Sequence, residues 1–177
     1  MKRYALGWIG AFALLGLTSC AGYKLGPVGG QIAGARSVQI KFFNNETLEP
    51  RLVAAVNHDL RHQLQQEGTF RLESEGDLVV TGVLESFTRN GVSYKPGDVL
   101  AVQDYSLRLN ARIKVTERAT GQVLLEREVT GDTIVRVGND FASGQQRAVP
   151  LIAEQLAARA TSLIADGPWS GGDSPEN

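Results

Sequence analysis

The sequence contains only one cysteine and two histidines among its 177 residues. A single cysteine, Cys20, cannot form a disulfide within the chain or build a zinc site made of several cysteines. It leaves open the roles of a nucleophile, a metal ligand, half of an intermolecular disulfide, a buried small residue or an attachment point. The chain also lacks an excess of either charge. Its net charge is −1 and its pI is about 6.1, which argues against nucleic acid as a partner.

Motifs for catalysis are missing as well. The sequence has no G-x-S-x-G segment, the motif that carries the nucleophile of many hydrolases. His58 and His62 have the spacing of the HExxH motif of metalloproteases, but Asp59 replaces its longer glutamate. In the helical repeat, both histidines fall on the side away from the apolar residues, where they face solvent. The sequence therefore predicts no enzyme, no metal site and no cofactor.

The first residues form an apolar segment behind a positive start. Met1-Lys2-Arg3 carries the charge, Tyr4–Leu17 is uncharged, and the small residues Thr18 and Ser19 lead to Cys20. This order of positive, apolar and small residues is typical of an export signal. The apolar run is shorter than the roughly 20 residues that a membrane-spanning helix needs. We therefore predict a cleaved signal peptide over residues 1–19.

The segment Leu17-Thr18-Ser19-Cys20 resembles the lipobox of bacterial lipoproteins, in which an aliphatic residue and two small residues precede a cysteine. The resemblance implies cleavage before Cys20 and acylation of both its thiol and its new amino group. Two or more acyl chains hold a soluble domain firmly to a bilayer. Ala21, in place of aspartate, implies sorting to the outer membrane. The glycine-rich residues 20–35 then predict a flexible, lipid-anchored tether.

Residues 36–166 have the composition and periodicity of a single domain. Alternating apolar and polar residues predict strands, and apolar residues three and four apart predict helices. The expected order is a strand at 36–43, a helix at 49–66, a short extended piece at 70–72, strands at 77–88, 102–117 and 123–135, and a helix ending near 165. Asn44-Asn45 predicts a turn, and residues 89–99 predict a turn-rich loop. Pro150 leaves the start of the last helix open, and residues 167–177 predict a disordered tail.

The longest alternation, within residues 102–117, places apolar side chains on one face of its strand and polar ones on the other. Two amphipathic helices need one sheet face to cover. We therefore expect an α+β fold, a two-layer sandwich with two helices packed on one face of a four-stranded mixed sheet. The opposite face would carry Arg108, Arg112 and Lys114 in a row. That row is either an ordinary solvated face with charge partners or a surface for an anionic ligand such as a phosphorylated glycolipid.

Taken together, the chain resembles the LPS-assembly lipoprotein family, LptE. The resemblance covers roughly residues 17–165 and rests on the lipobox, "GYKLG", "FFNNETLEP" and "DYSLRLNARIKVTERATGQVLLEREVTG". It implies a domain that plugs a large outer-membrane β-barrel partner, LptD, helps to assemble it, and contacts lipopolysaccharide on its way to the outer leaflet. The family places contacts around the hairpin loop before the long strand, where "YKPG" implies Lys95 as a contact. Two alternatives stay open, a structural or pilot lipoprotein of a different secretion barrel and an exported hydrolase.

The resemblance generates a first prediction for Lys95. The substitution Lys95→Glu should weaken binding of lipopolysaccharide, because it places a carboxylate where phosphate groups would bind. Binding to the purified glycolipid measures the effect. Unchanged binding would remove Lys95 from the site.

Overall fold

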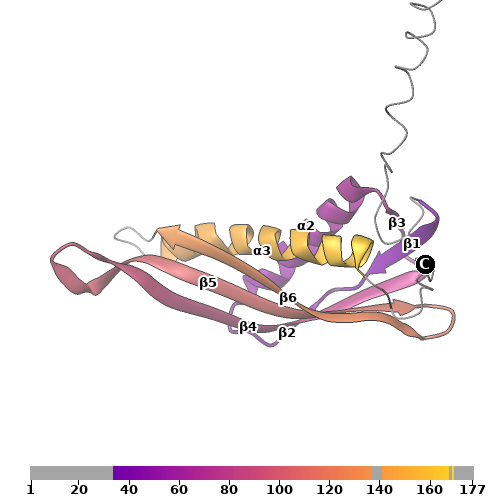
Figure 1. The fold of residues 1–177 in the computed structure, drawn as a ribbon, viewed down its shortest axis with the longest axis horizontal. Helices are drawn as coiled ribbons and strands as arrows, with labels where there is room; N and C mark the ends of the chain where they lie inside the picture. The colour runs from indigo at the N-terminus through magenta and orange to yellow at the C-terminus, as the bar shows by residue number, and fades with distance from the viewer. Residues whose placement is uncertain (1–33, 137–140, 168, 170–177) are drawn as a thin grey trace, which may run out of the picture.

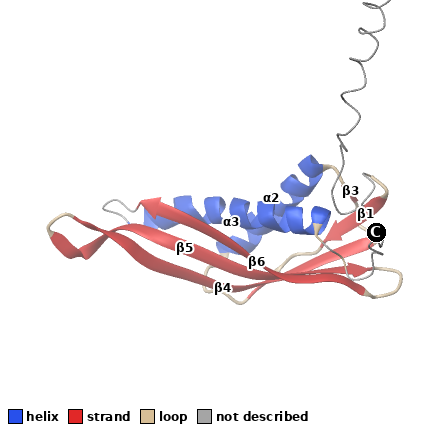
Figure 2. Cartoon of the chain, in the orientation of Figure 1, coloured by secondary structure: helices blue, strands red, loops and turns tan. Residues whose placement is uncertain are grey.

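The computed structural model describes residues 34–136, 141–167 and 169, except for the side chains of residues 95, 99–101 and 141–145. Within these residues the chain forms six strands and two helices in two layers (Figure 1; Figure 2). Cys20 and the predicted signal peptide lie outside them. The elements are β1 (Arg36–Ile40), β2 (Asn44–Asn45), α2 (Arg51–Glu67), β3 (Phe70–Leu72), β4 (Leu78–Lys95), β5 (Asp98–Glu117), β6 (Val123–Arg136) and α3 (Phe141–Asp166).

All six strands belong to one mixed sheet. Its order is β3-β1-β4-β5-β6, and β2 pairs with β4 off this path. β1 runs parallel to β3 and to β4, whereas β4, β5 and β6 are antiparallel neighbours. Both helices cover the same face of the sheet (Figure 1). The expected α+β sandwich is confirmed, and the number of strands is corrected from four to six.

The two extra strands are two and three residues long, which explains why the expected number was wrong. Residue type alone makes Asn44-Asn45 a turn, and three residues such as Phe70–Leu72 are too few to show alternation. Each segment becomes a strand because a neighbour offers hydrogen-bond partners. β2 pairs with β4, and β3 pairs with the start of β1. Such partners come from the tertiary arrangement.

β4 and β5 form one long hairpin that projects beyond the helices (Figure 1). Their pairing continues to Lys95 opposite Asp98, so the expected loop at 89–99 is wrong apart from the turn at Pro96-Gly97. Gly97 has a φ of 83°, and proline followed by glycine with positive φ is typical of a type II turn. The register shifts along this stretch absorb residues that break the alternation. Backbone pairing between two strands therefore outweighs the turn propensity of the residues within them.

The apolar core lies between the sheet and the two helices. β5 contributes its alternating residues Leu107, Leu109, Ala111, Ile113 and Val115, all buried. The helices contribute the stripes Leu52, Val56, Leu60 and Leu64 of α2, and Val149, Ile152, Leu156, Ala160 and Ile164 of α3, also buried. Burying a large apolar side chain stabilises a fold by about 1.5–3 kcal/mol. The predicted alternation and both predicted stripes are confirmed.

Pro150 lies inside α3, which begins at Phe141. The helix therefore does not start at the proline. A proline removes one N–H group from a helix and leaves the carbonyl four residues earlier without its bond. Pro150 and Gln146 are both exposed, so water is available to the orphaned carbonyl. The helix continues because the defect lies on its solvent side.

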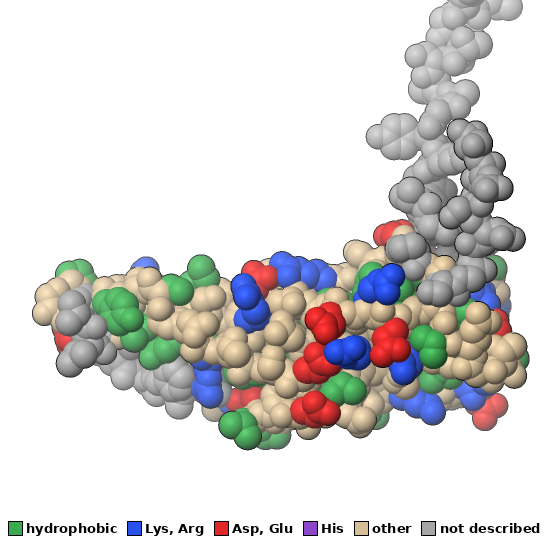
Figure 3. Space-filling view, turned by 60° about the horizontal axis from the view of Figure 1, so that its bottom comes forward, with side chains coloured by type: hydrophobic (Ala, Val, Ile, Leu, Met, Phe, Trp, Pro, Cys, Tyr) green, Lys and Arg blue, Asp and Glu red, His purple; other side chains and the backbone are tan. Residues whose placement is uncertain are grey.

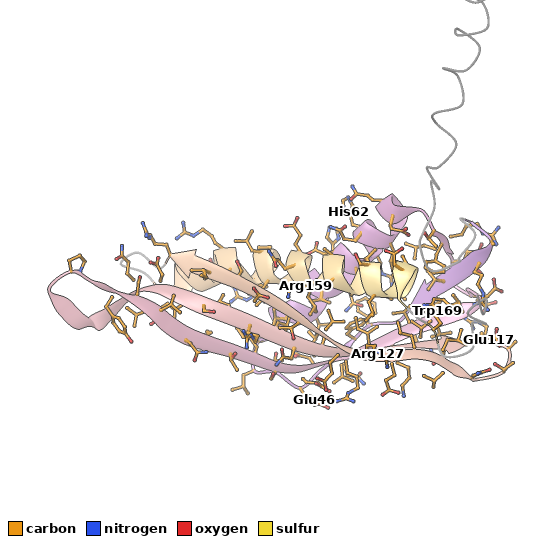
Figure 4. All side chains as sticks on the ribbon, viewed as in Figure 1. Glu46, His62, Glu117, Arg127, Arg159 and Trp169 are labelled. Carbon is orange, nitrogen blue, oxygen red and sulfur yellow. The ribbon has the colours of Figure 1, made fainter. Side chains whose placement is uncertain are left out.

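Trp169, which belongs to the segment predicted as a tail, packs against the first strands. Its ring stacks on Phe70 with centroids 5.9 Å apart, and the Arg36 guanidinium lies 5.6 Å from the ring. Its indole N–H donates to the carbonyl of Ile164 at 3.1 Å. Arg36 also forms an ion pair with Glu117 at 3.0 Å. Glu117 and Trp169 lie at the same end of the molecule (Figure 4). This cluster ties the end of α3 to the start of β1, next to the predicted tether.

Close packing of α3 on β6 depends on Gly131. A Cβ atom there would lie 2.8 Å from the carbonyl oxygen of Ile152 and 3.1 Å from the Leu156 Cβ. We expect Gly131→Ala to lower the free energy of unfolding by about 1–3 kcal/mol, because the added methyl pushes helix and strand apart. Urea denaturation measures the change. Ile134→Ala, at an exposed position of the same strand, should change it by less than about 0.5 kcal/mol. Equal losses would contradict the role of Gly131.

Candidate functional site

The face of the sheet opposite the helices carries charged pairs across β4, β5 and β6. Arg112 in β5 contacts Glu85 at 2.8 Å and Glu128 at 3.0 Å, and Lys114 contacts Glu126 at 3.3 Å. Acidic and basic side chains are accordingly interspersed on this side of the molecule (Figure 3). Arg112 and Lys114 therefore each lie beside a carboxylate of a neighbouring strand.

The charged pairs continue into neutral hydrogen bonds. The Asn110 amide donates to the Ser86 hydroxyl at 3.0 Å, and the Thr130 hydroxyl donates to the Asn110 amide oxygen at 2.9 Å. Residues opposite each other on neighbouring strands are close enough to interact in this way. These three groups occupy successive positions on the open face. We call them together the polar ladder, and its members are Glu85, Ser86, Asn110, Arg112, Lys114, Glu126, Glu128 and Thr130. The ladder satisfies most of its charges and hydrogen bonds internally.

Nearer the tip of the hairpin, Asp104 forms a second charged cluster. It accepts a hydrogen bond from Nε of Arg136 at 3.0 Å and another from the Ser93 hydroxyl. The Arg136 guanidinium, and after it the Ser93 hydroxyl, lowers the pKa of Asp104 below its usual value. In the ladder, the hydrogen bond to Glu85 raises the pKa of Arg112. Both groups thus stay charged over a wider range of pH than usual.

The structure brings three of the predicted contact residues onto one face of β5. Arg112 and Lys114 are paired within the polar ladder. Arg108 is exposed, and within the described part of the chain it makes no hydrogen bond or ion pair. Its neighbours in register are Thr88 and Asp132. Arg108 is therefore the cation of this row that is available to an anionic ligand.

Lys95 is not brought together with that row. It ends β4 opposite Asp98, ten residues before Arg108 along β5. At about 3.3 Å per residue, this corresponds to about 33 Å along the strand. The Lys95 side chain and Cys20 lie outside the described residues. A ligand that touched both Lys95 and Arg108 would have to extend along most of the projecting hairpin.

Several large apolar side chains are exposed. Val92 and Tyr94 near the hairpin tip are each 50% exposed. Sequence reasoning did not identify Phe42, which is 72% exposed, or Leu48, which is fully exposed. The exposure of Phe42 could have been inferred from its position next to Phe43 in the sequence. Phe43 is buried against Gly82, and adjacent residues of an extended segment point to opposite sides.

The two histidines lie on the outer side of α2. His58 and His62 are both exposed, and His62 lies 3.5 Å from the amide nitrogen of Gln66. In the ranges that the structure covers, no group of three His, Cys, Asp or Glu residues could hold a metal ion. Neither described helix has the length and apolar character needed to span a membrane.

The sequence matches no protein-family model and no curated protein, whereas solved structures share its fold. A minor lipoprotein from Acinetobacter baumannii has a TM-score of 0.52 at 12% identity, over 76% of this chain and 97% of that one. A hypothetical protein from Chlamydia trachomatis has a TM-score of 0.53 at 10% identity, over 75% and 96%. A protein from Xanthomonas campestris has a TM-score of 0.50 at 11% identity, over 79% and 87%. At such low identity the likeness concerns the fold alone.

The cluster around Asp104 generates a prediction on pH. Because the folded-state pKa lies below the unfolded value of about 3.9, ionised Asp104 stabilises the fold above that pH. This contribution is lost as the pH falls through the folded-state pKa. Arg136→Gln should return the pKa of Asp104 toward its usual value, as measured by NMR titration of its carboxyl carbon. Arg112→Gln removes a cation that does not contact Asp104 and should leave that pKa unchanged. A response to both changes would indicate general charge effects.

Proposed function

We propose that this chain is a lipid-anchored, non-enzymatic lipoprotein of the outer membrane. In this proposal it plugs a large β-barrel of the LptD type, helps the barrel to assemble, and contacts lipopolysaccharide during its delivery to the outer leaflet. The observation that carries the proposal is the polar ladder on the open face of a long, projecting hairpin. The resemblance of the sequence to the LptE family supports it independently.

The lipid anchor rests on Cys20 and its surroundings. The cysteine follows an apolar segment with a positive start and precedes a glycine-rich segment, as acylation and a flexible tether require. The described domain begins directly after this segment, where Arg36 opens β1. A minor lipoprotein from Acinetobacter baumannii has the same fold, so the fold is compatible with this mode of attachment.

The place inside a barrel rests on the chemistry of the open face. The interior of a large outer-membrane barrel is polar and filled with water. A sheet face made of paired charges and hydrogen bonds remains stable in such a lumen, because its groups are already satisfied and the apolar face is covered by the helices. The exposed Val92 and Tyr94 near the hairpin tip would supply apolar contacts with the partner.

Contact with lipopolysaccharide is assigned to Lys95 and to the three cations of β5. Arginine and lysine are the side chains that bind phosphate groups, and arginine does so with two parallel hydrogen bonds. Arg112 and Lys114 already have carboxylate partners, so they contribute less than Arg108, which has none within the described residues. In this proposal Lys95 contacts the ligand near the hairpin tip and Arg108 contacts it farther along the open face.

Capture of the partner tests the proposal. The tagged chain, extracted from membranes in mild detergent, should co-purify with a large outer-membrane β-barrel, and its depletion should reduce lipopolysaccharide at the cell surface. Cys20→Ala should prevent acylation, detected as the loss of the lipid mass from the mature protein, and should leave the domain folded. A barrel from a different secretion system would support the alternative role as a pilot lipoprotein. Absence of any barrel, with lipopolysaccharide transport intact after depletion, would contradict both.

A further inference from the structure

The described sheet ends in two very different edge strands. β3 has three residues, whereas β6 has 14. A long edge strand presents unpaired backbone N–H and C=O groups to which another strand can add. Arg159 of α3 bonds to the carbonyl oxygen of Thr130 in β6, so this carbonyl faces away from β5. Backbone groups of alternate residues point to the same side of a strand, so those of Glu128 and Asp132 also face outward.

A groove with a volume of about 410 Å³ lies between this edge and the helices. Its walls include Thr133 of β6, Gln63 of α2, and Leu151, Gln155 and Ala158 of α3. Leu151 is 48% exposed. Successive side chains of a strand point to opposite faces. Every second side chain of a strand added to β6 would therefore point toward α3, where Leu151 and Ala158 offer apolar contacts.

The remaining side chains of an added strand would lie on the open face, beside three carboxylates of β6. Glu126, Glu128 and Asp132 alternate there, each beside one cation of this chain. Glu128 shares Arg112 with Glu85 and its side chain is 69% exposed, so it keeps negative charge for a basic partner. Opposite charges on neighbouring strands attract, and like charges directly opposite each other repel. A strand with lysine or arginine at every second position therefore complements this edge.

We propose that the outer edge of β6 and the adjoining groove form a strand-addition site for an extended segment of a partner protein. In this segment basic side chains alternate with apolar ones. A second copy of β6 does not meet this requirement, because it would bring its own Glu126, Glu128 and Asp132 against the same carboxylates. The inference rests on the edge and the groove alone, and it does not depend on the proposed function.

Two arginines, Arg127 and Arg159, donate hydrogen bonds to backbone carbonyls of β6 (both are labelled in Figure 4). Arg127 donates to the carbonyl oxygen of Glu126 at 3.0 Å. Arg159 donates to the Thr130 carbonyl and also pairs with the Asp132 carboxylate at 2.7 Å. These bonds occupy outward carbonyls that would otherwise pair with any exposed strand. When the partner binds, its N–H group replaces Arg159 at Thr130, while Arg159 keeps its carboxylate partner.

A synthetic peptide of alternating lysine and valine, labelled with fluorescein, is a direct probe of the site. Fluorescence anisotropy should show saturable binding to the full-length protein, and a peptide with glutamate in place of lysine should not bind. N-methylation of the amides on one side of the peptide should abolish binding, because these amides donate to β6. N-methylation of the amides on the other side of the peptide should leave binding unchanged. Absence of binding, or equal effects of both methylation patterns, would overturn the proposal.

Matched protein variants separate strand addition from attraction by net charge. Glu128→Lys should weaken binding by about threefold or more, because it replaces an attractive cross-strand pair with a repulsive one. Glu46→Lys makes the same change of charge at an exposed residue after β2 and should leave binding unchanged. Arg159→Ala should tighten binding, because it releases the Thr130 carbonyl. Equal losses in the two lysine variants would overturn the proposal. The lysine variants and the methylated peptides decide the outcome even if Arg159→Ala does not fold.

Discussion

Antiparallel pairing of β4 with β5 is the interaction on which the rest of the domain depends. It extends from Leu78 opposite Glu117 to Lys95 opposite Asp98, and it fixes which face each side chain of both strands occupies. A slip of one residue would move the apolar set of β5 to the open face and bring its cations under the helices. The buried leucines under α2 and α3 penalise such a slip, so packing and register stabilise each other. β1 and β6 then pair with the outer sides of this hairpin.

The register shift between Leu84 and Ser86 shows how one irregularity serves both faces. Leu84 is buried and Phe87 packs against the core, yet strict alternation would turn two residues with this spacing to opposite sides. The extra residue at the shift is Glu85, and its carboxylate contacts Arg112. A bulge adds local twist and redirects a side chain. Here it keeps both apolar residues on the core side and gives the open face one of its carboxylates.

The surfaces around this frame differ in how their polar groups are satisfied. The polar ladder pairs its three carboxylates with Arg112 and Lys114 and keeps one excess negative charge, whereas Arg108 lies outside it. At the edge of β6, Arg127 and Arg159 donate hydrogen bonds to backbone carbonyls. The N–H groups of another strand can replace these hydrogen bonds. The open face therefore suits a watery surrounding and an anionic ligand, whereas the edge suits an extended peptide. Both properties follow from the alternation of side chains and backbone groups along the strands.

The sequence alone determined the elements whose periodicity is long, namely both helical stripes and the two faces of β5, because burial repeats at the period of each element. It also determined the place of Cys20 behind an apolar segment, because that signal is local. Only the tertiary structure decided the strands β2 and β3, the extension of the hairpin to Lys95 and the course of α3 through Pro150, since each depends on a neighbouring strand or on solvent exposure. The same holds for the candidate site. Alternation placed Arg108, Arg112 and Lys114 on one face, but only the register against Glu85, Glu126 and Glu128 decided which of these cations is already paired, because cross-strand partners are far apart in sequence.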